Sequence, residues 1–146
     1  MRTETLNKFE KEKTASKESN TRALNILWVD DEIEFLRPHI LYLEQNGYKV
    51  STASNGIDAL MEFEEHPFDI IFLDQNMPGL SGIETMARMK EINSRIPIVL
   101  ITKNESETVM KRAVSKDVAD YLVKPVSITQ VFACLHKILF LKRPGV

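Results

Sequence analysis

The chain has 146 residues, which is enough for one domain with its own hydrophobic core and too few for two comfortable ones. Its formal net charge of −2 argues against a general nucleic-acid or membrane-surface binder, and no apolar run approaches the roughly 20 residues of a membrane span. The one cysteine, Cys134, excludes an internal disulfide and a cysteine-rich zinc site and suits a reducing compartment. These totals predict a cytoplasmic protein with no membrane segment and no nucleic-acid-binding element within this chain.

Residues 1–22 differ in composition from everything that follows. Lysine, glutamate, serine and asparagine dominate there, and Leu6 and Phe9 are among the few large apolar side chains. Such a stretch buries too little surface to offset its ordering entropy, so we predict a disordered tail. An over-long start of the chain and a partner-binding arm are the alternatives. The folded domain is predicted to span residues 23–142, followed by a C-terminal tail or the start of a linker at 143–146.

Five short segments rich in β-branched and aromatic residues predict strands. They are LNILWV (24–29), YKVSTA (48–53), FDIIFL (68–73), IPIVLI (96–101) and VADYLV (118–123). Helical spacing fills the stretches between and after them, at residues 32–47, 55–66 and 82–93, then from Asn104 and from Ser127 onward. This alternation predicts a doubly wound α/β fold, (βα)5, with five parallel strands covered on both faces.

Two of the predicted helices carry signals about their ends. Pro38 lies inside the first helical stretch and predicts either a kink or a late helix start. The last helix opens with a capping box formed by Ser127 and Gln130. An apolar stripe of helical period follows this box, and it consists of Ile128, Val131, Phe132, Leu135, Ile138 and Leu139.

Polar side chains follow four of the five predicted strands. Asp30 and Asp31 follow the first strand, Asp74 the third, Thr102 the fourth and Lys124 the fifth. Because the carboxyl ends of parallel strands meet at one edge of a sheet, we expect these groups to gather there.

Three neighbouring carboxylates repel one another, and Mg²⁺ bound to their oxygens relieves that repulsion. No histidine or cysteine accompanies the acids, which disfavours zinc. A cation and a lysine beside a carboxylate suit the receipt of a phosphoryl group, with Asp74 as the nucleophile.

Each of these residues also has a plainer interpretation. Asp30 or Asp31 alone fits a helix N-cap, Lys124 alone fits a solvated surface lysine, and Thr102 alone fits an ordinary strand residue. The functional interpretation is favoured because these residues occur together, in order along the chain, and each one stands at the end of the strand where this chemistry requires it.

The pieces ILWVDDE, FDIIFLDQNMPGLSGIE, IPIVLIT and ADYLVKP together resemble the receiver domain of two-component response regulators, over roughly residues 24–141. The resemblance implies a flavodoxin-like strand order, 2-1-3-4-5, and a chain that catalyses only its own phosphorylation and dephosphorylation. It implies that Asp74 is the phosphoacceptor and that Asp30, Asp31 and Asp74 hold Mg²⁺, with the backbone carbonyl of Asn76 as a further ligand.

The same resemblance implies a switch and its partners. Thr102 matches the switch hydroxyl, Tyr121 the aromatic switch residue, and Lys124 the lysine beside the phosphate. Phosphorylation would alter the face of the fourth helix, fifth strand and fifth helix for protein–protein signalling. The implied partners are a histidine kinase, a phosphotransfer protein or a small phosphodonor, an unknown protein effector, and a second copy in a phosphorylation-dependent homodimer.

One position departs from the family pattern. Lys103 stands where family members usually carry a small residue, and we expect it, with Asn76 and Asn104, to tune the lifetime of the phosphate. Further detail, in LRPHILYLE, NMPGLSG and ITKNESE, resembles the subgroup of receivers that precede a PglZ-type domain of the alkaline-phosphatase superfamily. The sequence leaves open whether this is a stand-alone receiver or a fragment of a longer regulator.

Three other functions compete with this interpretation. A pseudo-receiver would use the same fold as a binding module without accepting phosphate. A phosphatase of the haloacid-dehalogenase type would need an acid two residues after its nucleophile, where Asn76 stands. A nucleotide or flavin binder would need a glycine motif that the chain lacks. The histidines, His39, His66 and His136, are predicted to lie outside the polar edge and to have no catalytic role.

Overall fold

The structure, a computed structural model, describes residues 23–103 and 118–141. Its strands form one sheet, made of β1 (Leu24–Val29), β2 (Tyr48–Ala53), β3 (Ile70–Asp74), β4 (Ile98–Thr102) and β5 (Asp120–Val123). Their order in the sheet is β2-β1-β3-β4-β5, and each neighbouring pair runs parallel. This confirms the predicted doubly wound fold and its strand order.

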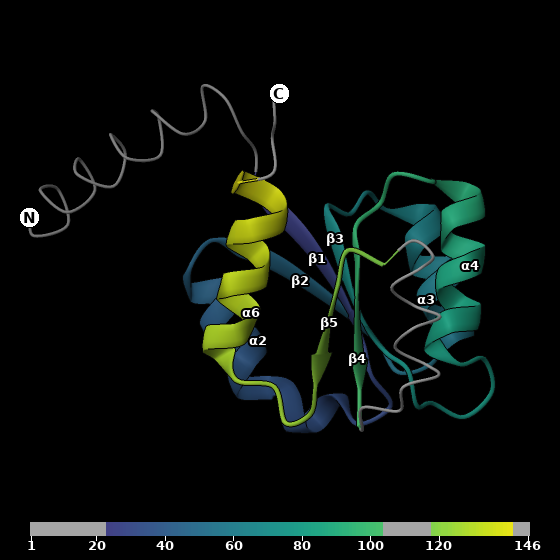
Figure 1. The fold of residues 1–146 in the computed structure, drawn as a ribbon, viewed down its shortest axis with the longest axis horizontal. Helices are drawn as coiled ribbons and strands as arrows, with labels where there is room; N and C mark the ends of the chain where they lie inside the picture. Colours follow the sequence, from purple (N-terminus) through teal and green to yellow (C-terminus); the bar gives the residue numbers. More distant parts are fainter. Residues whose placement is uncertain (1–22, 104–117, 142–146) are drawn as a thin grey trace, which may run out of the picture.

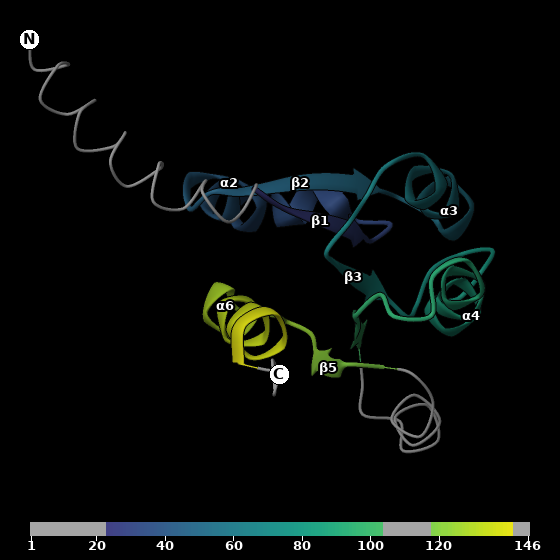
Figure 2. The ribbon, with the colours of Figure 1, turned by 90° about the horizontal axis from the view of Figure 1, so that it is seen from above.

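The described helices cover both faces of the sheet. They are η1 (Ile33–Leu36), α2 (Arg37–Gln45), α3 (Gly56–Glu65), α4 (Gly82–Ile92) and α6 (Ile128–Leu135), which continues as the π-helical turn η2 (His136–Leu141). Figures 1 and 2 show α2 and α6 on one face and α3 and α4 on the other. The helix predicted from Asn104 lies outside the described residues. Within 23–103 and 118–141, no helix has the length and apolarity that crossing a bilayer requires.

Two hydrophobic clusters fill the space between sheet and helices. Trp28, Phe72 and Ile101 belong to the cluster under α2 and α6, whereas their strand neighbours Leu73 and Leu100 belong to the cluster under α3 and α4. Every residue of β3 and β4 is buried. Burial on both faces explains why these strands are nearly continuous in apolar residues.

The helix starts follow the capping signals of the sequence. Pro38 lies in the first turn of α2 after the short η1 helix, so it marks a late helix start and not a kink. The expected capping box of Ser127 and Gln130 is present at α6. A second box at α4, between Ser81 and Glu84, has the same pattern and was not anticipated.

The third strand ends one residue later than the sequence predicts. Asp74 pairs with Ile101 in the sheet register, and the N–H of Gln75 donates to the carbonyl of Ile101 at 2.7 Å. The backbone of Asp74 is therefore held by the sheet itself. A carboxylate on a strand residue is more precisely placed than one on a free loop.

Gly82, the first residue of α4, packs against the end of β3. A Cβ atom there would lie 2.6 Å from the carbonyl oxygen of Asp74 and 2.7 Å from Cα of Gln75. Both neighbours are backbone atoms, so neither can rotate away. The absence of a side chain at Gly82 lets α4 start close against Asp74.

We expect Gly82→Ala to lower the free energy of unfolding by roughly 1–3 kcal/mol, because the added methyl group forces the backbone at Asp74 to shift. Urea unfolding followed by Trp28 fluorescence measures this. Gly79→Asn is the control, because Gly79 has φ +80° and open space where a side chain would go. Asparagine tolerates that conformation, so its loss should be smaller. Unchanged stability of Gly82→Ala would show that the close approach is not needed.

Candidate metal and phosphoryl site

Three carboxylates meet where β1 and β3 end. Asp30 directly follows β1 and Asp74 is the last residue of β3, which is the neighbour of β1 in the sheet. One carboxylate oxygen from each of Asp30, Asp31 and Asp74 lies within 4.8 Å of the others. The side chains of Asp30 and Asp74 are almost fully buried, at 2% and 1% exposure, whereas Asp31 is exposed. The cluster therefore has two inner acids and one that faces solvent.

Lys124 supplies the positive charge nearest to the two inner acids. Its Nζ lies 3.2 Å from Oδ2 of Asp30 and 3.4 Å from Oδ2 of Asp74. Its backbone N–H donates to the carbonyl of Thr102 at 2.8 Å, which fixes its Cα at the end of β5 beside β4. The ammonium thus bridges the ends of two strands from the end of a third.

The other oxygen of each inner acid accepts a backbone hydrogen bond. Oδ1 of Asp30 accepts from the N–H of Glu32 at 2.8 Å, and Oδ1 of Asp74 accepts from the N–H of Asn76 at 3.2 Å. Both contacts reach two residues ahead, as in the turns that aspartate side chains make at the start of loops. Each carboxylate is held at both oxygens, so its plane is set before any ligand arrives.

The charges in this cluster do not balance. Burial raises the pKa of the Asp74 carboxyl, and the nearby charge of Asp30 raises it further against the opposing effect of Lys124. Burial lowers the pKa of the Lys124 ammonium, but Asp74 and Asp30 outweigh it, and the pKa rises overall. Three carboxylates face one ammonium, and such a set of oxygen donors fits a hard divalent cation such as Mg²⁺.

The remaining predicted site residues lie around this cluster with different exposures. Thr102 ends β4 and is 3% exposed, whereas Asn76 and Lys103 are exposed at the surface. The side-chain oxygen of Asn76 accepts from the N–H of Lys103 at 3.3 Å and so links the loop after β3 to the end of β4. Tyr121 lies in β5 with 36% of its surface exposed. Asn104 lies outside the described residues.

One histidine is closer to the site than the sequence predicts. His39 lines a hollow of about 210 Å³ together with Asp30 and Lys124. Its exclusion from the polar edge is therefore wrong. The signal was present in the sequence, because His39 lies three residues after Leu36 and four before Leu43 and so shares the apolar face of its helix.

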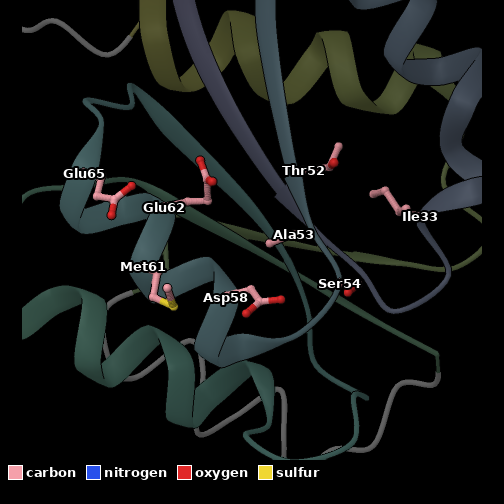
Figure 3. Close-up of a pocket in the computed structure, with 8 residues that line it drawn as sticks. All are labelled: Ile33, Thr52, Ala53, Ser54, Asp58, Met61, Glu62 and Glu65. Carbon is pink, nitrogen blue, oxygen red and sulfur yellow. The ribbon is translucent and has the colours of Figure 1, made fainter.

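A larger hollow of about 390 Å³ lies between the end of β2 and α3. Figure 3 shows Asp58, Glu62 and Glu65 along α3 beside this hollow, with Met61 between them. Its lining contains no lysine, arginine, histidine or cysteine. Of the residues expected to take part in phosphoryl chemistry, Asp30 and Lys124 line the smaller hollow, and none lines the larger one.

We expect Asp74→Asn to raise the melting temperature of the metal-free protein by a few degrees near pH 8, because it removes a buried, repelled charge. The raised pKa of Asp74 means that its contribution to stability is greatest at acid pH and declines as the pH rises from its ordinary value of 3.8 through the folded value. The difference between variant and wild type should therefore shrink as the pH falls toward the acid side.

Thermal unfolding at several pH values in the presence of EDTA measures this difference. Glu91→Gln, a neutralised carboxylate on the exposed side of α4, is the matched control and should change little. A lower melting temperature for Asp74→Asn at pH 8 would mean that its pairing with Lys124 outweighs burial and repulsion.

Known proteins are similar to this chain in sequence, and solved structures are similar to it in fold. The family model described as the response regulator receiver domain matches residues 26–136. The chain is 33% identical over 116 residues to the transcriptional regulatory protein ZraR of Klebsiella oxytoca, covering 80% of this chain and 26% of that protein. It is 35% identical over 111 residues to the transcriptional regulatory protein ResD of Bacillus subtilis, covering 76% of this chain and 46% of that protein. The chain thus spans less than half the length of either relative.

Solved structures match over most of this chain. A CheY-like receiver domain protein from Methanospirillum hungatei has a TM-score of 0.79 at 21% identity, covering 86% of this chain and 100% of that one. At such identity the likeness shows the fold alone. The response regulator TrrA from Thermotoga maritima, in complex with Mg²⁺–BeF, has a TM-score of 0.70 at 29% identity, covering 78% of this chain and 97% of that one. Because the family model spans nearly all of the sheet and its helices, this chain belongs to the response regulator receiver domain family.

Proposed function

We propose that this receiver takes a phosphoryl group onto Asp74 from a phosphohistidine of a histidine kinase or phosphotransfer protein, or from a small phosphodonor. The carboxylate oxygen forms a bond to phosphorus, the bond from phosphorus to the donor atom breaks, and an acyl phosphate results. The observation that carries the proposal is the gathering of Asp30, Asp31 and Asp74 within 4.8 Å, with the Lys124 ammonium 3.4 Å from Asp74.

The surrounding residues supply what a phosphoryl group needs. Asp30, Asp31 and Asp74, with the backbone carbonyl of Asn76, would hold Mg²⁺, which when bound supplies positive charge for the phosphoryl oxygens. Lys124 already bridges the two inner acids and would pair with a phosphoryl oxygen once Asp74 is modified. TrrA, which is similar to this chain, is seen in complex with Mg²⁺–BeF, and this supports the same use of the site here.

The proposed switch runs from Thr102 to Tyr121. Thr102 ends β4 beside Lys124, whose N–H donates to its carbonyl, so a movement of Thr102 toward the phosphate also affects the end of β5. Tyr121 lies in β5 with 36% exposure, so its ring is partly in solvent before the proposed inward movement. We propose that this movement alters the face that the helix predicted from Asn104 would form with β5 and α6, and so changes contacts with a protein effector or a second copy of the chain.

A pseudo-receiver that binds partners without phosphorylation is the alternative. Burial of Asp74 beside a lysine argues against it, because a buried acid that serves no chemistry is a cost to stability. We also propose membership of the subgroup that precedes a PglZ-type domain, on the sequence pieces after Asp30, Asp74 and Thr102. Determining the complete open reading frame that encodes these sequence pieces tests that membership.

Incubation with acetyl phosphate and Mg²⁺ should add one phosphoryl group to the wild-type chain and none to Asp74→Asn. Intact mass, followed by peptide mapping, measures the adduct and its site. The same incubation with EDTA should give at least about tenfold less adduct, because the carboxylates then repel the donor. No adduct on a folded wild-type protein that binds Mg²⁺ would favour the pseudo-receiver, and an adduct on Asp74→Asn would point to another acceptor.

We expect Lys103→Ala to lose its phosphoryl group several-fold faster than wild type. The N–H of Lys103 is bonded to Asn76, so its exposed cationic side chain starts at the edge of the site, where it can screen the acyl phosphate from water. Decay of the phosphorylated mass after removal of the donor measures the rate. Lys49→Ala, at an exposed lysine on β2, is the control. Equal or slower decay in Lys103→Ala would mean that this side chain points away from the phosphate.

A further inference from the structure

His39 connects α2 to the loop that carries Lys124. Nε2 of His39 lies 2.7 Å from the carbonyl oxygen of Val126, across 87 positions of the sequence. A carbonyl oxygen can only accept, so Nε2 carries the hydrogen and donates it. Val126 lies two residues after Lys124, and this contact therefore ties the loop between β5 and α6 to the helix on the same face of the sheet.

The loop is held at both of its ends. Between them it is held by the His39 contact and by the packing of the Val126 side chain against the core under α2 and α6. Before the loop, the N–H of Lys124 donates to Thr102, and after it Ser127 caps α6. Pro125 has no N–H to donate. The contact from His39 is thus placed between two anchors, where it limits how the chain after Lys124 can rotate.

The imidazole ring packs against one aromatic ring, which packs against a second. It stands edge-on to Trp28, with ring centroids 6.2 Å apart and an interplanar angle of 88°. Trp28 in turn stacks on Phe72, with centroids 4.8 Å apart. The indole N–H of Trp28 is buried without a hydrogen-bond partner among the described residues, so packing alone places this ring.

Both rings belong to residues that shortly precede the two inner acids in the sequence. Trp28 is two residues before Asp30 on β1, and Phe72 is two residues before Asp74 on β3. Residues two apart on a strand point to the same face, so Phe72 and Asp74, which both belong to β3, share a face. The contacts from Val126 through His39 to Trp28 and Phe72 therefore connect the Lys124 loop to both strands that carry its acidic partners.

We propose that His39 is a positioning residue for the reaction at Asp74, because its hold on the Val126 carbonyl sets the place from which Lys124 reaches Asp30 and Asp74. His39 also lines the hollow that borders Asp30 and Lys124. The effect on reaction rate rests on the proposed phosphoryl transfer, whereas the positioning of Lys124 does not depend on that function.

Two substitutions separate the hydrogen bond from the packing of the ring. His39→Phe keeps a ring against Trp28 and removes the donor. His39→Gln keeps an N–H at a similar reach from the helix and removes the ring. His66→Gln is the matched control, because His66 is an exposed histidine at the end of α3.

The first measurement is hydrogen exchange at the Lys124 amide by NMR, which requires no phosphoryl chemistry. We expect exchange about tenfold faster in His39→Phe and near the wild-type rate in His39→Gln and His66→Gln. Unchanged protection of the Lys124 amide in His39→Phe would overturn the proposal. If the Lys124 amide exchanged as fast in His39→Gln as in His39→Phe, the effect would not come from the hydrogen-bond donor of His39.

The second measurement is the rate of adduct formation with acetyl phosphate and Mg²⁺, with and without Lys124→Ala. We expect His39→Phe to slow the reaction about fivefold when Lys124 is present and to cause no further slowing in Lys124→Ala, since the two changes then act through one group. Equal slowing in both backgrounds would overturn a role through Lys124. A wild-type protein that takes no phosphoryl group, yet shows the expected exchange pattern, would refute the proposed function and leave the positioning of Lys124 supported.

Discussion

The bridge that Lys124 makes between Asp30 and Asp74 is the contact on which the site depends. Two almost fully buried carboxylates at the ends of adjacent strands repel each other in a region of low dielectric. The ammonium at 3.2 and 3.4 Å offsets part of that repulsion and leaves a net negative cluster. This imbalance supports the proposal that a divalent cation, and with it a phosphoryl group, binds at this edge of the sheet.

The sheet topology creates this cluster from distant parts of the chain. The strand order places β1 and β3 next to each other, so Asp30 and Asp74 lie side by side although 44 positions separate them in the sequence. The chain places β2 on one side of β1 and β3 on the other, so the strand order reverses at this point. In doubly wound sheets such a reversal leaves a crevice beyond the ends of the strands. Backbone hydrogen bonds at Glu32 and Asn76 then orient the two carboxylates.

The two sides of the site differ in what they connect to. On one side, Lys124, His39 and Trp28 join the acids to α2 and to the core beneath it. On the other, Asn76 accepts a hydrogen bond from the N–H of Lys103, an exposed residue that follows β4, and Tyr121 in β5 is partly exposed. A buried side that holds the charges and an exposed side that can change its contacts suit a domain that reports a modification to partners.

The sequence by itself determined the alternation of strands and helices, their order in the sheet through the family resemblance, and the set of polar residues at the strand ends. The strands, the helices and the polar residues at the strand ends are local features, because strand propensity, capping boxes and the position of Asp74 after an apolar run are determined within a few residues. The tertiary structure alone decided that Asp31 is exposed while Asp30 is buried, that Lys124 contacts both inner acids, and that His39 reaches Val126. The last two depend on how helices and strands far apart in the chain pack together, and no periodicity within one segment contains that information.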